Sequence, residues 1–254
     1  MSSQICPSVS PRKNVGIIGG MGPYAGVNYL ECFLQECSTL IAASGDELKD
    51  QLYPPHYLFQ LPVVDRTEAL LMSEEERQRV FRQICDQLVA MRRLKVEVAA
   101  IACNTAHAWH AQLQQAVPQV KIIHIAEVCA RFLVEVGVTR VCLLGTAGTI
   151  RSGLYATALD ARGIECIEPT AEELDTLMAG IYRGVKANDR ILGQACFATV
   201  VSSMRQRTGV KNFLMACTEI PLVLKADELA ATVSLFDPTL ISAKFLAQSA
   251  FSED

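Results

Sequence analysis

Short apolar runs alternate along the chain with longer segments in which apolar and polar residues recur at helical spacing. The runs predict strands at 15–19, 56–61, 96–102, 120–125, 140–145, 165–167, 210–216 and 232–236. The longer segments predict helices at 24–41, 73–95, 106–118, 127–136, 151–161, 172–186, 189–208 and 238–249. Strands that alternate with helices of this length are typical of parallel sheets covered by helices on both faces, so the pattern indicates an α/β fold.

One order of motifs occurs twice. A glycine-containing turn at 19–22 is followed by an Ala-Cys pair ending at Cys103, and a second turn at 145–148 is followed by Ala-Cys at Cys217. Parallel sheets bind ligands at the carboxyl ends of their strands, where both turns and both cysteines are predicted, so we expect them to meet in one cleft. The repetition predicts two similar α/β domains, 14–118 joined by the C-terminal segment 229–254, and 119–228, with a flexible tail at 1–13.

Composition narrows the class of protein. The chain has 254 residues, enough for one large or two smaller domains, and half of them are hydrophobic. A net charge of −4 argues against a nucleic-acid partner, and no apolar run reaches membrane-spanning length. The ten cysteines contain no Cys-x-x-Cys pair, and the four histidines lack zinc spacing with them, so we expect neither a disulfide framework nor a metal site. Residues 1–14 lack the apolar run of a signal peptide or anchor, and we expect a cytoplasmic protein.

Two of the cysteines occupy positions suited to chemistry. Cys103 and Cys217 each follow a predicted strand and precede a predicted helix start, where unpaired N–H groups lower a thiol pKa. A facing pair of this kind would let one thiolate take a proton while the other thiol returns one. Buried, inert thiols are the alternative. We assign that structural role to Cys32, Cys37, Cys85, Cys129, Cys142, Cys166 and Cys196, and place Cys6 in the tail.

The first glycine turn also satisfies the Gly-x-Gly-x-x-Ala pattern of dinucleotide sites, as Gly20-Met21-Gly22-Pro23-Tyr24-Ala25. A proline inside the pattern and the lack of an acidic residue in the strand at 56–61 argue against a nicotinamide cofactor. A turn whose N–H groups meet a small carboxylate explains the same glycines. No lysine stands in a recognisable pyridoxal context, and we expect no cofactor.

Several charged residues near these motifs can be interpreted as either functional or structural. Arg66 at a strand end suits bidentate binding of a carboxylate, or a surface ion pair with Asp65. His107 could orient or activate a neighbouring group, or be a structural histidine at a helix start. Glu219 could tune the protonation of a nearby thiol or cap a helix. Lys186, at the end of a predicted helix, has a structural explanation on composition alone.

Taken together, these motifs resemble the aspartate/glutamate racemase family of cofactor-independent amino-acid racemases. The matching residues are Gly19-Gly20-Met21-Gly22-Pro23, Asp65-Arg66-Thr67, Ala102-Cys103-Asn104-Thr105-Ala106-His107 and Ala216-Cys217-Thr218-Glu219-Ile220-Pro221-Leu222. The resemblance implies two Rossmann-like domains related by a pseudo-two-fold axis, an active site between them and a homodimer. It also implies that Arg66 and Lys186 recognise the distal carboxylate of an acidic amino acid. Val64 departs from the proline that many members have there, and the Asp-Arg-Thr element favours aspartate over glutamate.

We therefore expect racemisation of L- and D-aspartate by proton transfer at Cα between Cys103 and Cys217. The expected substrate-binding residues are Met21, Arg66, Asn104, Thr105, Thr146, Lys186 and Thr218, supported by Asp65, His107 and Glu219. Alternatives remain open. A glutamate or broad-specificity racemase, or a dicarboxylate cis–trans isomerase, fits the same motifs. The two cysteines disfavour a single-cysteine decarboxylase. A binding protein with inert thiols, or a dinucleotide oxidoreductase, would lack the thiol chemistry.

Overall fold

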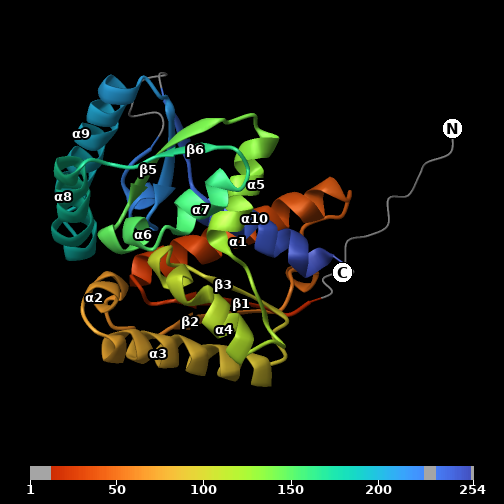
Figure 1. Cartoon of the computed structure of the whole chain (residues 1–254). Helices are drawn as coiled ribbons and strands as arrows, with labels where there is room; N and C mark the ends of the chain where they lie inside the picture. The colour runs from red at the N-terminus through yellow and green to blue at the C-terminus, as the bar shows by residue number, and fades with distance from the viewer. Residues whose placement is uncertain (1–12, 226–232, 253–254) are drawn as a thin grey trace, which may run out of the picture.

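Two four-stranded parallel sheets form the framework of the computed structural model, which describes residues 13–225 and 233–252 (Figure 1). The first sheet has the order β2-β1-β3-β4, built from β1 (Val15–Gly19), β2 (His56–Gln60), β3 (Val98–Ile101) and β4 (Lys121–Ile122). The second has the order β6-β5-β7-β8, built from β5 (Arg140–Gly145), β6 (Glu165–Ile167), β7 (Asn212–Ala216) and β8 (Ser234–Phe236). Both halves thus use the same spatial order, which confirms the predicted pair of Rossmann-like α/β domains.

The helices cover both faces of each sheet. They are α1 (Pro23–Ala43), α2 (Arg66–Leu71), α3 (Glu74–Arg93), α4 (His110–Ala116), α5 (Ile125–Glu135), α6 (Ala147–Arg151), α7 (Leu154–Asp160), α8 (Ala171–Ala179), α9 (Arg190–Thr208) and α10 (Pro238–Phe251). Figure 1 shows α3 and α4 on the outer face of the first sheet, α8 and α9 on the outer face of the second, and α1, α5, α7 and α10 between the sheets. None of the helices in the described ranges is long and apolar enough to cross a bilayer.

Local sequence signals account for the helix ends. Pro23 takes the first position of α1, where its missing N–H costs no hydrogen bond. The Ser73 side chain accepts a hydrogen bond from the Glu76 N–H at the start of α3. At its other end, α9 stops at Gly209, whose φ of 70° is in the left-handed region that favours glycine.

The strand pairings refine the expected division of the chain. β4 pairs with β3 in the first sheet, although the segment at 120–125 was expected to open the second half. β8 pairs with β7 in the second sheet, whereas α10, which follows it, packs along α1. The chain therefore crosses between the halves at both junctions, and the boundaries at 118/119 and 228/229 remain a proposal. Residues 1–12 of the expected tail, including Cys6, and residues 226–232 lie outside the described residues.

The helix predicted at 172–186 is wrong in its second half. α8 ends at Ala179, and a π-helical turn, Gly180–Gly184, precedes a 3₁₀ turn, Val185–Ala187. The reason is close packing against α9. A Cβ at Gly180 would lie 2.7 Å from a Phe197 ring carbon, and one at Gly184 would lie 2.7 Å from the Gly193 Cα. The π-helical turn carries Tyr182 and the 3₁₀ turn carries Lys186, so the two turns set the directions in which these side chains leave the backbone.

Candidate active site

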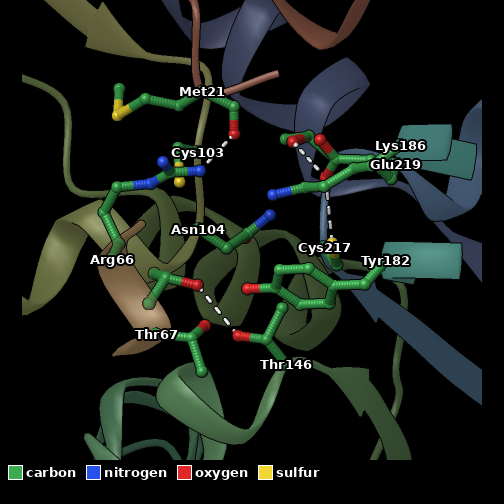
Figure 2. A pocket seen from close by; sticks show the side chains of 12 residues that line it. Met21, Arg66, Thr67, Cys103, Asn104, Thr146, Tyr182, Lys186, Cys217 and Glu219 are labelled. Carbon is green, nitrogen blue, oxygen red and sulfur yellow. Dashed lines mark hydrogen bonds between the residues drawn. The ribbon is translucent and has the colours of Figure 1, made fainter. Parts of the chain in front are cut away.

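A small cavity lies where the carboxyl ends of β1, β3, β5 and β7 face each other across the two halves (Figure 2). Its volume is about 10 Å³, room for about one water molecule. Its lining comprises Met21, Arg66, Thr67, Cys103, Asn104, Thr105, Thr146, Tyr182, Lys186, Cys217, Thr218 and Glu219. We call this the inner cavity. Ten of these residues were predicted, and two supporting residues, Asp65 and His107, stand behind the lining.

Cys103 lies in the loop after β3 and is only 5 % exposed. Figure 2 shows the Arg66 guanidinium beside its sulfur atom. Burial alone would lower the pKa of Arg66, but the negative charge of Cys103, the charge of Asp65 and a hydrogen bond with Cys103 raise it above its usual value. Cys103 thus has a cation as its immediate neighbour.

The Arg66 guanidinium is itself held by main-chain oxygens. Nη2 donates to Met21 O at 2.6 Å, and Nη1 donates to Val63 O and Val64 O at 3.1 and 3.2 Å. Nε is buried and has no hydrogen-bond partner among the described residues. The backbone therefore fixes this cation in one place, next to the first thiol, and leaves Nε as its remaining donor.

Cys217 follows β7 directly and has the opposite kind of neighbour. Its Sγ donates a hydrogen bond to Glu219 Oε2 at 3.1 Å. Burial raises the pKa of the Cys217 thiol well above its ordinary value, the charge of Glu219 raises it further, and Lys186 partly offsets both. Cys217 therefore holds its proton. The sequence predicted that the position before a helix start lowers this pKa, but burial and Glu219 raise it. The role of Glu219 in tuning the thiol stays a proposal.

Glu219 is buried, with 4 % of its surface exposed. Its Oε2 also accepts a hydrogen bond from Thr218 Oγ1 at 3.3 Å. Its Oε1 accepts no hydrogen bond from any residue that the structure describes. Oε1 faces Gly22, where a Cβ would lie 2.7 Å from it.

Lys186 belongs to a group of three polar side chains. Its Nζ lies 3.9 Å from Asp65 Oδ2 and 4.7 Å from the centre of the Tyr182 ring. The Tyr182 hydroxyl donates to the Asp65 carboxylate, at 3.0 Å from Oδ1 and 2.9 Å from Oδ2. Burial alone would raise the pKa of Asp65, but hydrogen bonds from the Glu68 N–H and Tyr182, together with Lys186, lower it below its usual value. The ammonium of Lys186 is thus positioned at the edge of the cavity by an ionised Asp65.

Three threonine hydroxyls join the two halves beside the thiols. Thr105 Oγ1, after β3, lies 2.9 Å from both Thr146 Oγ1 and Thr149 Oγ1, which follow β5. Thr146 and Thr149 are 3.1 Å apart. We call this group the threonine ring. Nearby, Asn104 Oδ1 accepts a hydrogen bond from the Tyr155 hydroxyl, while its buried Nδ2 has no partner among the described residues.

His107 contacts the loop that carries Cys103 but does not line the inner cavity. Its Nδ1 lies 2.9 Å from Cys103 O and its Nε2 lies 3.2 Å from Ile123 O. Burial lowers the pKa of His107 to about 3, and the neighbouring His124 and His110 contribute to the lowering. The ring is therefore neutral, and its single N–H donates to only one of these two carbonyl oxygens.

A second, larger cavity adjoins the inner one. Its volume is about 290 Å³. Its lining comprises Gly20, Met21, Gly22, Pro23, Tyr24, Ala25, Arg66, Val185, Lys186, Glu219 and Leu222. We call this the outer cavity. Met21, Arg66, Lys186 and Glu219 line both cavities, so these four side chains form the boundary between them.

Thr67, Tyr182 and Thr149 are site residues that the sequence interpretation did not select. Thr67 lies in the quoted Asp-Arg-Thr motif, Tyr182 lies four residues before Lys186, and Thr149 lies in α6, three residues after Thr146. Only their proximity in sequence to selected residues could have indicated these three. Their contacts could not be predicted, because they depend on how the two halves pack together. In the described ranges, no group of three His, Cys, Asp or Glu side chains is placed to hold a metal ion.

Comparisons with known proteins concern the fold and the family of the chain. The model of a family described as Asp/Glu/Hydantoin racemase matches residues 18–246. The broad specificity amino-acid racemase RacX of Bacillus subtilis (strain 168) is 26 % identical over 232 residues, which cover 91 % of this chain and 95 % of the relative. The Picrophilus torridus aspartate racemase structure has a TM-score of 0.75 and 27 % identity, and covers 94 % of each chain. An aspartate racemase homologue from Pyrococcus horikoshii OT3 has the same fold, with a TM-score of 0.73 and 23 % identity over 95 % of this chain and all of that one.

Proposed function

Because the chain belongs to the Asp/Glu/hydantoin racemase family and is an amino-acid racemase, we propose that it interconverts L- and D-aspartate. The observation that carries this proposal is the pair of buried thiols in one cavity, with a cation beside one and a carboxylate beside the other. Racemisation requires a proton to be removed from one face of Cα and another to be added to the opposite face. Two thiols, one from each of two similar halves, meet this requirement.

The proposed reaction is a two-base proton transfer. The Cys103 thiolate removes the α-proton of one enantiomer, and the Cys217 thiol gives its proton to the opposite face of Cα. Cys103 then carries the proton and Cys217 the negative charge, so the other enantiomer reacts with the roles reversed. The α-proton is only weakly acidic, so the negative charge that develops must be stabilised within the site. The Asn104 amide and the Thr218 hydroxyl, which line the inner cavity, would do so at the α-carboxylate together with nearby backbone N–H groups.

The remaining binding residues have proposed roles as well. Lys186, at the edge of both cavities, would bind the distal carboxylate, with Arg66 Nε as a second donor. Thr105 and Thr146 would contact the α-carboxylate after the threonine ring opens, because each hydroxyl in the ring already has partners. Met21 would contact the substrate from the turn after β1. The inner cavity is far smaller than an amino acid, so binding must widen it.

Aspartate is favoured over larger substrates by the Asp-Arg-Thr element and by the likeness to the Picrophilus torridus structure. Broad specificity is the second candidate. It is favoured by the Bacillus subtilis relative and by the outer cavity, which offers space beyond Lys186 for a longer side chain. The homodimer and the cytoplasmic location expected from the sequence remain predictions of this proposal.

The test is incubation of the purified protein with L-aspartate in D₂O without added cofactor, with NMR and optical rotation recorded together. We expect the α-proton signal and the optical rotation to disappear, while L-glutamate remains unchanged. Reaction of both amino acids would replace the aspartate assignment by broad specificity. Exchange of the α-proton with retained configuration would overturn the two-base reaction. No exchange with either substrate would favour the dicarboxylate isomerase or the binding protein.

A further inference from the structure

Glu219 has one carboxylate oxygen with a partner and one without. Oε2 accepts hydrogen bonds from Cys217 Sγ and Thr218 Oγ1, at 3.1 and 3.3 Å. Oε1 is buried and accepts none from the described residues. A buried carboxylate oxygen without a partner is costly, because the charge has lost its hydration without gaining a hydrogen bond. The protein therefore keeps an acceptor in place that its own described side chains do not use.

The unused oxygen belongs to a side chain at the boundary between the two cavities. Glu219 lines both the inner and the outer cavity. Oε1 faces the backbone of Gly22, which lines the outer cavity, and the missing side chain of this glycine leaves between them a space that a Cβ would fill. An ordinary side chain at position 22 would fill that space, because even its Cβ would lie 2.7 Å from Oε1.

The charges around the cavities assign a ligand to this oxygen. Arg66 and Lys186 are the cations in the lining, and both suit carboxylates of the substrate. The remaining charged group of an acidic amino acid is its α-ammonium, a donor-only cation, and Glu219 is the lining carboxylate with a free acceptor. We propose that Glu219 Oε1 binds the α-ammonium group of the substrate, and that Glu219 is thereby the residue that selects amino acids over other dicarboxylates. This inference rests on the proposed racemase function.

The same contact couples binding to the second thiol. The negative charge of Glu219 helps to keep the proton on Cys217. An ammonium group at Oε1 offsets part of that charge, so an amine-bearing substrate makes the Cys217 proton easier to release onto Cα. A dicarboxylate without an amino group leaves the thiol as it was. Glu219 would thus bind the amino group of the substrate and, through that contact, make the Cys217 proton easier to transfer to Cα.

The experiment compares affinities for racemic aspartate and racemic malate, in which a hydroxyl replaces the ammonium, by isothermal titration calorimetry. A racemic ligand shows no net turnover, so binding is measured directly. In the wild type we expect aspartate to bind at least about tenfold more tightly than malate, as a charge-assisted hydrogen bond provides. In Glu219→Gln this preference should fall to about twofold or less, chiefly through weaker binding of aspartate.

Two further variants complete the design. Glu173→Gln removes another buried carboxylate, paired with Arg207 far from the cavities, and should leave the preference unchanged. Gly22→Ala places a methyl group against Oε1 and should lower the preference even if Glu219→Gln does not fold. A preference retained in both Glu219→Gln and Gly22→Ala would overturn the inference. That result differs from failure of the racemase proposal. If the racemase proposal were wrong, the wild type would neither bind aspartate nor exchange its α-proton.

Discussion

The two halves of the molecule share a sheet order and an Ala-Cys ending, yet their thiols have opposite surroundings. In the first half, Cys103 lies against the Arg66 guanidinium, which three main-chain oxygens hold in place. In the second, Cys217 donates a hydrogen bond to the Glu219 carboxylate. The difference shows that a repeated fold places two sulfur atoms at equivalent positions, whereas nearby charges of opposite sign give them different surroundings.

Replacing either thiol by a hydroxyl gives the largest expected effect. Cys103→Ser and Cys217→Ser should each reduce racemisation by about a thousandfold, because a serine hydroxyl is a far weaker acid than a thiol and the proton transfer depends on that group. The two variants should differ in what remains. Each should exchange the α-proton of only one enantiomer in D₂O without inversion, and the two enantiomers should be opposite. Racemisation near the wild-type rate in either variant would contradict the two-base reaction.

Arg66→Lys tests the cation of the first half. Lysine keeps the charge but cannot donate to Met21 O, Val63 O and Val64 O from one planar group. We expect kcat to fall by about tenfold to a hundredfold, and the free energy of unfolding in urea to fall by about 2–4 kcal/mol. Arg140→Lys, in an exposed pair with Glu165, is the matched control and should change stability by less than about 0.5 kcal/mol. Equal effects of the two substitutions would remove the special role of Arg66.

The order of alkylation by iodoacetamide measures the same difference directly. At pH 7 we expect Cys103 to be labelled about tenfold faster than Cys217, because the thiolate is the reactive form and the raised pKa of Cys217 leaves very little of it at that pH. In a Cys103→Ser background, labelling of Cys217 should rise only at high pH, because burial and Glu219 raise its pKa. Adding Glu219→Gln should move that rise to lower pH, because a negative charge that opposes ionisation is gone. Peptide mapping by mass spectrometry distinguishes the sites, and unchanged pH dependence would exclude Glu219 as a cause.

Thr149→Val gives the smallest expected effect and tests the link between the halves. It removes one hydroxyl of the threonine ring while the contact of Thr105 with Thr146 remains. We expect a loss of about 1–2 kcal/mol in unfolding free energy, the usual contribution of a buried hydrogen bond. Thr199→Val, on the exposed surface of α9, should change stability by less than about 0.5 kcal/mol. A similar result for both would mean that the ring adds nothing to the association of the halves.

The sequence predicted the fold class because strand and helix periodicity is local information. The segments before Cys103 and Cys217 were found as strands, and their carboxyl ends did meet at one cavity. The membership of β4 and β8 could not be obtained in this way, because pairing at a sheet edge depends on contacts between distant segments. The π-helical turn was missed for a similar reason, since it results from packing of Gly180 and Gly184 against α9.

Some site residues could likewise be predicted from local sequence, whereas others depend on contacts between distant segments. Cys103 and Cys217 could be chosen from the sequence because each follows a predicted strand, and Glu219 because it lies two residues after Cys217. Tyr182 could not, because its role comes from the contact with Asp65, 117 residues away. The orientation of Arg66 was also beyond the sequence. Its type suggested a carboxylate ligand, but the carbonyl oxygens that hold it are defined only by the folded loops.

The size of the inner cavity has a consequence for the lifetime of the enzyme. With room for about one water molecule, it keeps both sulfur atoms away from oxidants and electrophiles. Each catalytic cycle must widen that space to admit an amino acid, and the widened form is the one in which peroxide or a toxic metal ion can reach the thiols. Damage should therefore accumulate with the number of openings and not with time in storage. The rate of thiol damage should therefore depend on the fraction of time that the cavity is widened.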